Sequence, residues 1–163
     1  MIISVFPGDF QPRANIISIG LKSHSGQNRI WLPGNFDSEA DMLRDFVSYF
    51  LSSSDKIIIG FNILKFDIPF LVLKTQSIQE FDRFFEKINY SNIEDLFVIL
   101  TFRNKGRLLS LEQYLKIFDV GQRIVSHSEI LRSAKSKEFE KVEKYMEERL
   151  GAISSLFMKV WNG

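Results

Sequence analysis

Residues 60–71, with the sequence GFNILKFDIPFL, give the strongest structural signal in the chain. The segment at 56–61 is short, apolar and rich in β-branched side chains, which is typical of a strand buried on both faces of a sheet. Asn62 then turns the chain, and Pro69 suits the first turn of a helix. The stretch therefore predicts a buried strand, a turn, and a helix that begins near the carboxylate of Asp67.

The chain before this stretch changes from strand patterns to a helix pattern. Apolar runs at 2–6, 16–22 and 29–32 are separated by turns rich in Pro, Gly and Ser. They predict three strands in an antiparallel meander. Over 38–51 the apolar residues recur every three or four positions, as on one face of an amphipathic helix. The first residues of that helix, Ser38 to Asp41, have the spacing of a capping box.

The chain after this stretch is mostly helical. We expect helices at 68–74, 95–102, 110–118 and 137–160, and a short edge strand at 88–93. No internal repeat or linker interrupts the pattern, which predicts a single domain spanning 1–163. The order of elements indicates an α/β fold with a mixed five-stranded sheet flanked by helices.

The composition limits the classes of protein to consider. The chain has 163 residues, with 21 Lys and Arg against 20 Asp and Glu, for a formal net charge of +1. This balance argues against a broad electrostatic binder of nucleic acid or anionic membrane, although it allows a local basic groove. The chain has no Cys. Disulfides and thiolate metal sites are therefore excluded, which leaves His and carboxylates as metal ligands.

Two further features bear on location and partners. The first residues do not resemble a targeting signal and no segment is long enough to span a bilayer, so we expect a soluble, cytoplasmic protein. The chain has 16 Phe residues. They indicate either an aromatic-rich core or, in addition, an apolar surface for a partner.

The segment from Asn62 to Leu71 resembles the second exonuclease motif of the proofreading domains of family B DNA polymerases and of their stand-alone relatives. That motif has an Asn, a short spacer, an aromatic residue and an Asp, often followed by an apolar residue, Pro, an aromatic residue and Leu. The matching residues are Asn62, Phe66, Asp67, Pro69, Phe70 and Leu71. Residues 144–150 resemble the third motif, in which a Tyr, here Tyr145, precedes the last acidic residue by four. The resemblance implies a ribonuclease-H-like fold over nearly the whole chain.

The resemblance also implies a chemistry. In this family four carboxylates hold two Mg²⁺ ions that clamp the scissile phosphate, and the Tyr helps to orient the attacking water. Here the two carboxylates of the first strand fall on Phe6 and Gly8, and the last one falls on Arg149. Only Asp67 remains. One carboxylate cannot hold two Mg²⁺ ions, and a guanidinium is a fixed cation. We therefore expect a degenerate site with no catalytic residues, no metal and no cofactor.

The sequence allows more than one arrangement of the Asp67 and Arg149 side chains. In the family fold the last helix approaches the Asp of the second motif, so Arg149 is expected to face Asp67, and a bidentate ion pair could replace the metals. The alternative is that Arg149 points to solvent. Asp67 could also serve only as the cap of its helix.

Three functions follow as alternatives. The leading one is an inactive exonuclease-like domain that binds single-stranded DNA or RNA, as an accessory module in DNA replication, DNA repair or RNA processing. The residues expected to contact nucleic acid are Asn62, Phe66 and the basic loop residues Arg103, Lys105 and Arg107, although that loop could equally be a solvated turn.

The second alternative is a protein-interaction scaffold, including a homodimer through the last helix. The third is a residual metal-dependent nuclease. It would need Asp9, Asp67 and either Glu147 or Glu148 to form an unusual site. A one-residue helical step turns Glu148 about 100° away from position 149.

Overall fold

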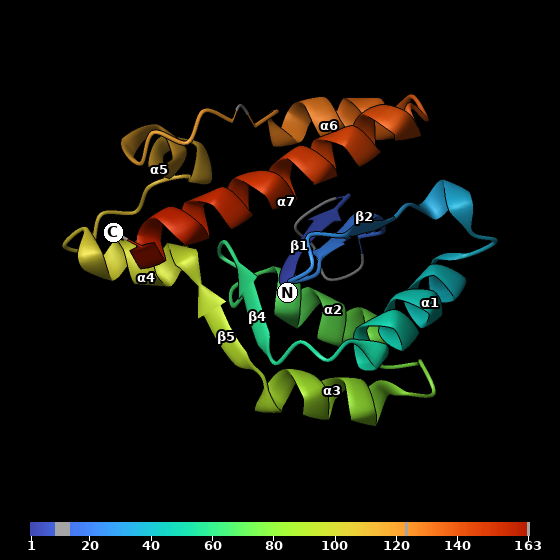
Figure 1. Ribbon diagram of the computed structural model, residues 1–163. Coiled ribbons are helices and arrows are strands. Elements are labelled where there is room, and N and C mark those ends of the chain that lie inside the picture. Colours follow the sequence, from blue (N-terminus) through green and yellow to red (C-terminus); the bar gives the residue numbers. More distant parts are fainter. Residues whose placement is uncertain (9–13, 123, 163) are drawn as a thin grey trace.

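A mixed five-stranded sheet forms the centre of the structure (Figure 1), in the order β3-β2-β1-β4-β5. The computed structural model describes residues 1–8, 14–122 and 124–162, without the side chain of Tyr90. The strands are β1 (Ile2–Pro7), β2 (Ile16–Lys22), β3 (Asn28–Trp31), β4 (Ile57–Gly60) and β5 (Asn92–Asp95). β1 to β3 pair antiparallel, whereas β1 with β4 and β4 with β5 pair parallel. The predicted α/β class, mixed sheet and meander are confirmed.

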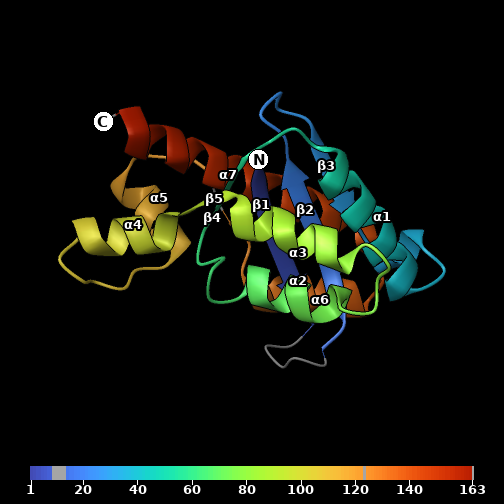
Figure 2. The same cartoon turned by 90° about the horizontal axis from the view of Figure 1, so that it is seen from below.

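Helices cover both faces of this sheet. On one face lie α1 (Glu39–Ser52), α2 (Asp67–Thr75) and α3 (Phe81–Tyr90), which Figure 2 shows in front of the strands. The long helix α7 (Phe139–Asn162) crosses the other face beside α6 (His127–Lys135). Beyond the sheet, α4 (Leu96–Arg103) and α5 (Leu111–Ile117) lie near the end of α7, and the 3₁₀ turn η1 (Pro33–Asn35) precedes α1.

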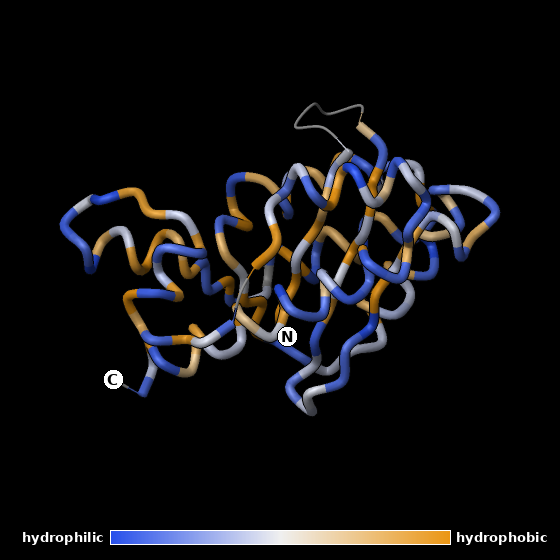
Figure 3. The backbone as a smooth tube through the Cα atoms, turned by 90° about the horizontal axis from the view of Figure 1, so that it is seen from above, coloured by the Kyte–Doolittle hydropathy of each residue, from blue (hydrophilic) through white to orange (hydrophobic). Residues whose placement is uncertain are grey.

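Strand β1 contributes to the hydrophobic cores on both faces. Ile3 and Val5 pack into the core beneath α1 to α3, whereas Ile2 and Phe6 pack into the core beneath α7. Because side chains alternate along a strand, Ser4 points to the same side as Phe6, toward α7. Hydrophobic and hydrophilic segments alternate along the helical turns (Figure 3), as expected for helices with one face on a sheet.

Helix α7 approaches the sheet closely at Gly20 in β2. A Cβ atom at Gly20 would lie 2.4 Å from Met146 Cγ and 3.0 Å from Leu150 Cδ1. A side chain at this position would therefore push α7 away from the strands. None of the helices in the described residues is both long and apolar enough to cross a membrane.

Several local expectations are confirmed. Ser38 accepts a hydrogen bond from the Asp41 N–H at the start of α1. Ser110 and Gln113 form a complete capping box at the start of α5. Asn62 turns the chain with a φ of 63°, a left-handed conformation that Asn tolerates better than most residues.

Other expectations were wrong. The strand expected at 88–93 begins only at Asn92, because Ile88 still belongs to α3, where it packs with Phe84 at helical spacing. β4 is not buried throughout, since Ile57 is 45% exposed beyond the single residue pair that joins β4 to β1. Helix α6 was not expected, although a capping box at Ser126 marks its start.

Candidate functional site

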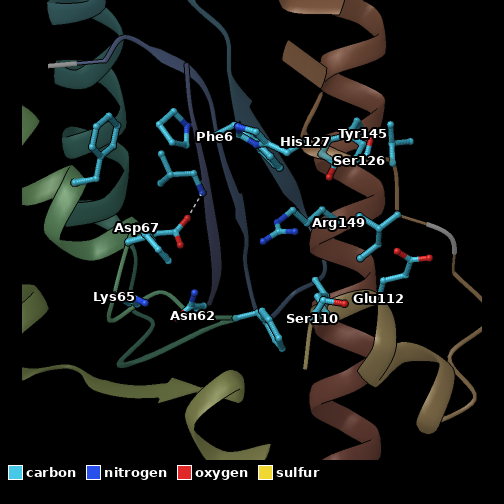
Figure 4. Close-up of a pocket in the computed structure, with 18 of the residues that line it drawn as sticks. Phe6, Asn62, Lys65, Asp67, Ser110, Glu112, Ser126, His127, Tyr145 and Arg149 are labelled. Carbon is cyan, nitrogen blue, oxygen red and sulfur yellow. Dashed lines mark hydrogen bonds between the residues drawn. The ribbon is translucent and has the colours of Figure 1, made fainter. Parts of the chain in front are cut away.

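A pocket of about 760 Å³ opens between α2 on one side and α5, α6 and α7 on the other (Figure 4). Its wall contains four residues of the predicted degenerate site, namely Phe6, Asp67, Tyr145 and Arg149. Asn62 and Phe66 also line it, whereas Gly8 does not. The fold thus brings together motif residues that lie far apart in the sequence.

Asp67 is the first residue of α2 and is buried. Its Oδ1 atom accepts a hydrogen bond from the Val5 N–H at 2.5 Å. β4 pairs with β1 only at Ile2 and Ile59, so Val5 lies beyond that pairing and its N–H needs another acceptor. Asp67 is therefore not the N-cap of α2, which was one alternative from the sequence: the N-cap is Phe66, which makes no side-chain capping bond.

The pKa of Asp67 is raised to about 6, mainly because burial disfavours the ionised carboxylate. The positive charge of Arg149 and the hydrogen bond from Val5 oppose this rise, and the negative charge of Asp95 adds to it. The carboxyl group of Asp67 therefore ionises near pH 6 rather than near pH 4.

Arg149 points from α7 into the pocket, toward the wall that holds Asp67 (Figure 4). Its Nε donates a hydrogen bond to Ser4 Oγ at 2.9 Å, and its Cζ lies 5.3 Å from the centre of the Phe6 ring. Among the described residues, the ion pairs within 4.0 Å do not include Asp67 with Arg149. The expected bidentate pair is therefore not formed, because Ser4 holds the guanidinium on β1 while Asp67 turns to the strand backbone.

Phe6, which the resemblance aligns with the first carboxylate of the family, places an aromatic ring in the pocket wall. Phe6 is buried and packs edge-on against Tyr145, with ring centres 5.2 Å apart, and stacks on His127 at 5.5 Å. Burial raises the pKa of Tyr145, partly offset by Arg149. Burial and then the charge of Arg149 lower the pKa of His127, which therefore favours its neutral form.

The donor set does not fit the two Mg²⁺ ions of the family. Asp67 is the one residue that the resemblance aligns with a family carboxylate and that is itself a carboxylate, and its Oδ1 already accepts the Val5 N–H. Within 1–8, 14–122 and 124–162 no three His, Asp or Glu side chains are grouped closely enough to hold a metal ion. Asp9 lies outside the described residues, and neither Glu147 nor Glu148 lines the pocket.

A second buried carboxylate, Asp95, holds the motif loop in shape. Its oxygens accept hydrogen bonds from Asn62 N at 2.8 Å, Leu64 N at 3.0 Å and Phe97 N at 3.0 Å. The last of these caps α4. This role of Asp95 was not expected from the sequence, although an Asp directly before an apolar helix is a known cap signal.

Phe66 and Lys65 form the outer part of one pocket wall. Phe66 is 41% exposed, and Lys65 Nζ lies 5.3 Å from the centre of its ring. The opposite wall includes Ser110, Ser126 and His127, which sequence reasoning did not place in the site. No local signal could have placed them, because they reach the pocket only through the packing of α5 and α6 around α7.

The basic loop lies apart from the pocket. Arg103 donates to the carbonyl oxygen of Val160 at 3.0 Å, near the end of α7. Lys105 and Gly106 take positive φ angles of 52° and 81° in the turn after α4. Neither these residues nor Arg107 lines the pocket. Their contact with nucleic acid stays a prediction.

This sheet order, with a pocket that joins the second and third motifs, defines an exonuclease-like α/β domain. Residues 10–107, more than half of the chain, match the model of the DNA polymerase family B exonuclease domain. The chain therefore belongs to this family. Phe6 and Arg149, which carry the departures from the catalytic pattern, lie outside the matched range.

A comparison with solved structures supports the same fold. The family B DNA polymerase from the hyperthermophilic archaeon Pyrobaculum calidifontis superposes with a TM-score of 0.64 and 17% identity. The match covers 96% of this chain and 24% of the polymerase, so the chain spans about a quarter of that protein's length. No curated protein matches the sequence.

Proposed function

We propose that this domain binds single-stranded DNA or RNA at the pocket without hydrolysing it, as an accessory module in DNA replication, DNA repair or RNA processing. The observation that carries the proposal is the composition of the pocket. Asn62, Phe66, Asp67 and Tyr145 of the exonuclease motifs still face one cavity, while Phe6 and Arg149 stand where the family has carboxylates.

Two properties of the pocket support binding. Phe66 exposes part of an aromatic ring on the pocket wall, and bases stack on such rings whatever the sequence. Lys65 and Arg149 supply positive charge to the same cavity. The same lining also includes the carboxylates of Asp67, Glu112 and Glu129, so attraction of a phosphate backbone depends on direct contact with Lys65 or Arg149 rather than on net charge.

The donor set supports the absence of hydrolysis. Two-metal catalysis needs several oxygen ligands around both ions. Here a hydrogen-bonded carboxylate, a guanidinium and a phenyl ring take those positions. Among the described residues, the pocket offers a phosphodiester no group of carboxylates that would hold a metal ion and its bound water.

Fluorescence anisotropy with labelled DNA and RNA decamers at low salt tests the binding. We expect affinity in the micromolar range, and about a tenfold loss for Phe66→Ala, since one stacked base contributes about 1–3 kcal/mol. Phe85→Ala is the matched control, because Phe85 is 46% exposed on α3 and does not line the pocket. No binding at tens of micromolar would refute the proposal.

A nuclease assay with Mg²⁺ and Mn²⁺ tests the second half of the proposal. We expect no shortening of either decamer. Cleavage by the wild type that disappears in Asp67→Ala would show an active enzyme and overturn the proposal.

A protein partner is the second candidate function. Large apolar side chains are exposed on α4, α5, the loop between them and the end of α7: Phe102, Leu108, Ile117 and Trp161. The apolar stripe of α7 is itself buried in the chain's own core, so a homodimer through that stripe would require α7 to leave the sheet. Light scattering on the purified protein tests self-association, and a monomer at high concentration would argue against a homodimer.

A further inference from the structure

The guanidinium of Arg149 lies in a partly buried place, and within residues 1–8, 14–122 and 124–162 it forms no ion pair with a carboxylate. Its side chain is half-buried, its Nε is used by Ser4, and no carboxylate of the described residues lies within 4.0 Å. A guanidinium has five N–H donors, and the side chains of Ser4 and Tyr145 engage part of them, which leaves the others for a ligand. A half-buried charge of this kind favours an anion that brings its own oxygens.

The acidic groups in the pocket wall do not fill that role. Glu112 lies 3.2 Å from Lys116 on the same helix. Glu129 accepts hydrogen bonds from Ser126 N at 3.0 Å and Ser126 Oγ at 2.7 Å as part of the α6 cap. Asp67 accepts the Val5 N–H. Among the described residues, Arg149 is therefore a cation at the pocket floor without a direct ion pair, while ionised Asp67 across the pocket offsets part of its charge.

The surroundings of Arg149 select the kind of anion. Two phosphate oxygens match the parallel N–H groups of a guanidinium. The ring of Phe66 lies on the wall of the same cavity, and about 760 Å³ is within the usual range for pockets that hold a small ligand. A phosphate attached to a nucleoside fits this combination of a cation and a stacking surface.

The position of Arg149 also favours a terminal phosphate of a strand over an internal one. Arg149 lies over Phe6 and Ser4, both buried, so it sits at the floor of the pocket. The end of a strand can reach such a floor, whereas an internal phosphate would need an open path for the strand on both sides. A terminal phosphate monoester also carries more negative charge than an internal diester.

We propose that Arg149 directly binds the terminal phosphate of a single strand, with no metal ion, in the place where the family would hold metals. This inference rests on the proposed binding of single strands at the pocket, and it adds a preferred chemical end and independence from divalent cations.

The test compares three decamers of one sequence, ending in 3′-hydroxyl, 3′-phosphate or 5′-phosphate, with and without EDTA. We expect one phosphorylated end to bind about tenfold more tightly than its unphosphorylated counterpart, with EDTA causing no change. Arg149→Met is expected to abolish that preference, and Arg149→Lys to keep part of it. Arg83→Met, an exposed site on α3, is the control for loss of one positive charge. A thermal melt confirms that each variant is folded, and Arg149→Lys keeps the test valid if the Met variant does not fold.

The outcomes separate this inference from the proposed function. Strand binding with no preference for a phosphorylated end, or with a preference that Arg149→Met leaves unchanged, overturns the inference alone. Loss of binding in EDTA also overturns it. No binding of any decamer overturns the proposed function. A nucleoside monophosphate that binds through Arg149 when no decamer does would support the phosphate site and identify a free nucleotide as its source.

Discussion

The Asp67 carboxylate accepts the Val5 N–H at 2.5 Å, and this bond ties the first turn of α2 to the middle of β1. The residue that resembles a metal ligand in sequence is therefore already engaged by the protein's own backbone. Its surroundings are buried and apolar enough to raise its pKa to about 6. Asp67 therefore has a structural role in joining α2 to β1, and its ionised form lowers the stability of the folded protein relative to its protonated form.

That cost predicts how stability varies with pH. A carboxyl group in an unfolded chain titrates near 3.9, so folded Asp67, with a pKa of about 6, binds its proton more tightly. Its contribution to the free energy of unfolding is complete below about pH 4 and is lost as pH rises to about 6. Asp67→Asn keeps an acceptor oxygen for Val5 without the charge. We expect it to be more stable than the wild type at pH 7.5 by about 1–3 kcal/mol, since one pKa unit equals 1.36 kcal/mol.

Urea denaturation at several pH values measures this difference. Other carboxylates also titrate, so the informative quantity is the wild type minus Asp67→Asn, which should grow in favour of the variant between pH 4 and 6. Asp82→Asn, on the exposed side of α3, is the control. A wild type more stable than Asp67→Asn at pH 7.5 would mean that ionised Asp67 is stabilising.

Arg149 should also be visible in the titration of Asp67. Its charge now lowers the pKa of Asp67 across the pocket. Arg149→Met is therefore expected to raise that pKa further, whereas Arg83→Met should leave it unchanged. Carboxyl carbon NMR of Asp67 measures both. An unchanged pKa in Arg149→Met would contradict the placement of the guanidinium in the pocket.

Asp95 is expected to matter more for stability than Asp67. Its carboxylate accepts three backbone N–H groups, from Asn62, Leu64 and Phe97. Asp95→Ala would leave these donors without their acceptor, at a cost of at least about 3 kcal/mol at neutral pH. Asp95→Asn should lose less, because it keeps one acceptor oxygen. Chemical denaturation gives both values, and a loss below about 1 kcal/mol for the Ala variant would argue against this role.

The contact between α7 and Gly20 gives a packing prediction. The Cβ of Gly20→Ala would lie 2.4 Å from Met146 Cγ, so Met146 and α7 must shift, at a cost of about 1–3 kcal/mol. Gly121→Ala is the matched control, because no atom lies within 4 Å of the place that a Cβ would take there. The control should be neutral or slightly stabilising, since alanine restricts the unfolded chain. Equal stability of the two variants would contradict the close packing of α7.

The parts of the fold that could be predicted depend on local patterns. The meander, α1 and the capping box at Ser110 follow from alternation, helical spacing and cap residues that lie a few positions apart. The strand predicted at 88–93 was wrong because it also rested on a local pattern. These residues join the end of α3 to the start of β5 and contain β-favouring side chains from both.

The pocket was predictable only in part. The motifs placed Phe6, Asp67, Tyr145 and Arg149 in one site, but not their contacts. Val5, the partner of Asp67, donates through its backbone N–H. Almost every residue type carries this group, so the sequence gives no signal for the contact. The expected ion pair between Asp67 and Arg149 is not formed because Arg149 has another acceptor. Ser4, which precedes Val5 in β1, offers Arg149 its hydroxyl oxygen on the same face as Phe6.

The bond between Ser4 and Arg149 also has a consequence for biosynthesis. Its two partners are 145 residues apart, so β1 emerges from the ribosome long before the helix that covers it. Until α7 is made, the face of β1 that carries Ile2 and Phe6 has no cover, and contacts of such long range form slowly. The pocket is therefore among the last parts to assemble on a nascent chain, and any ligand can be held there only after translation has passed α7.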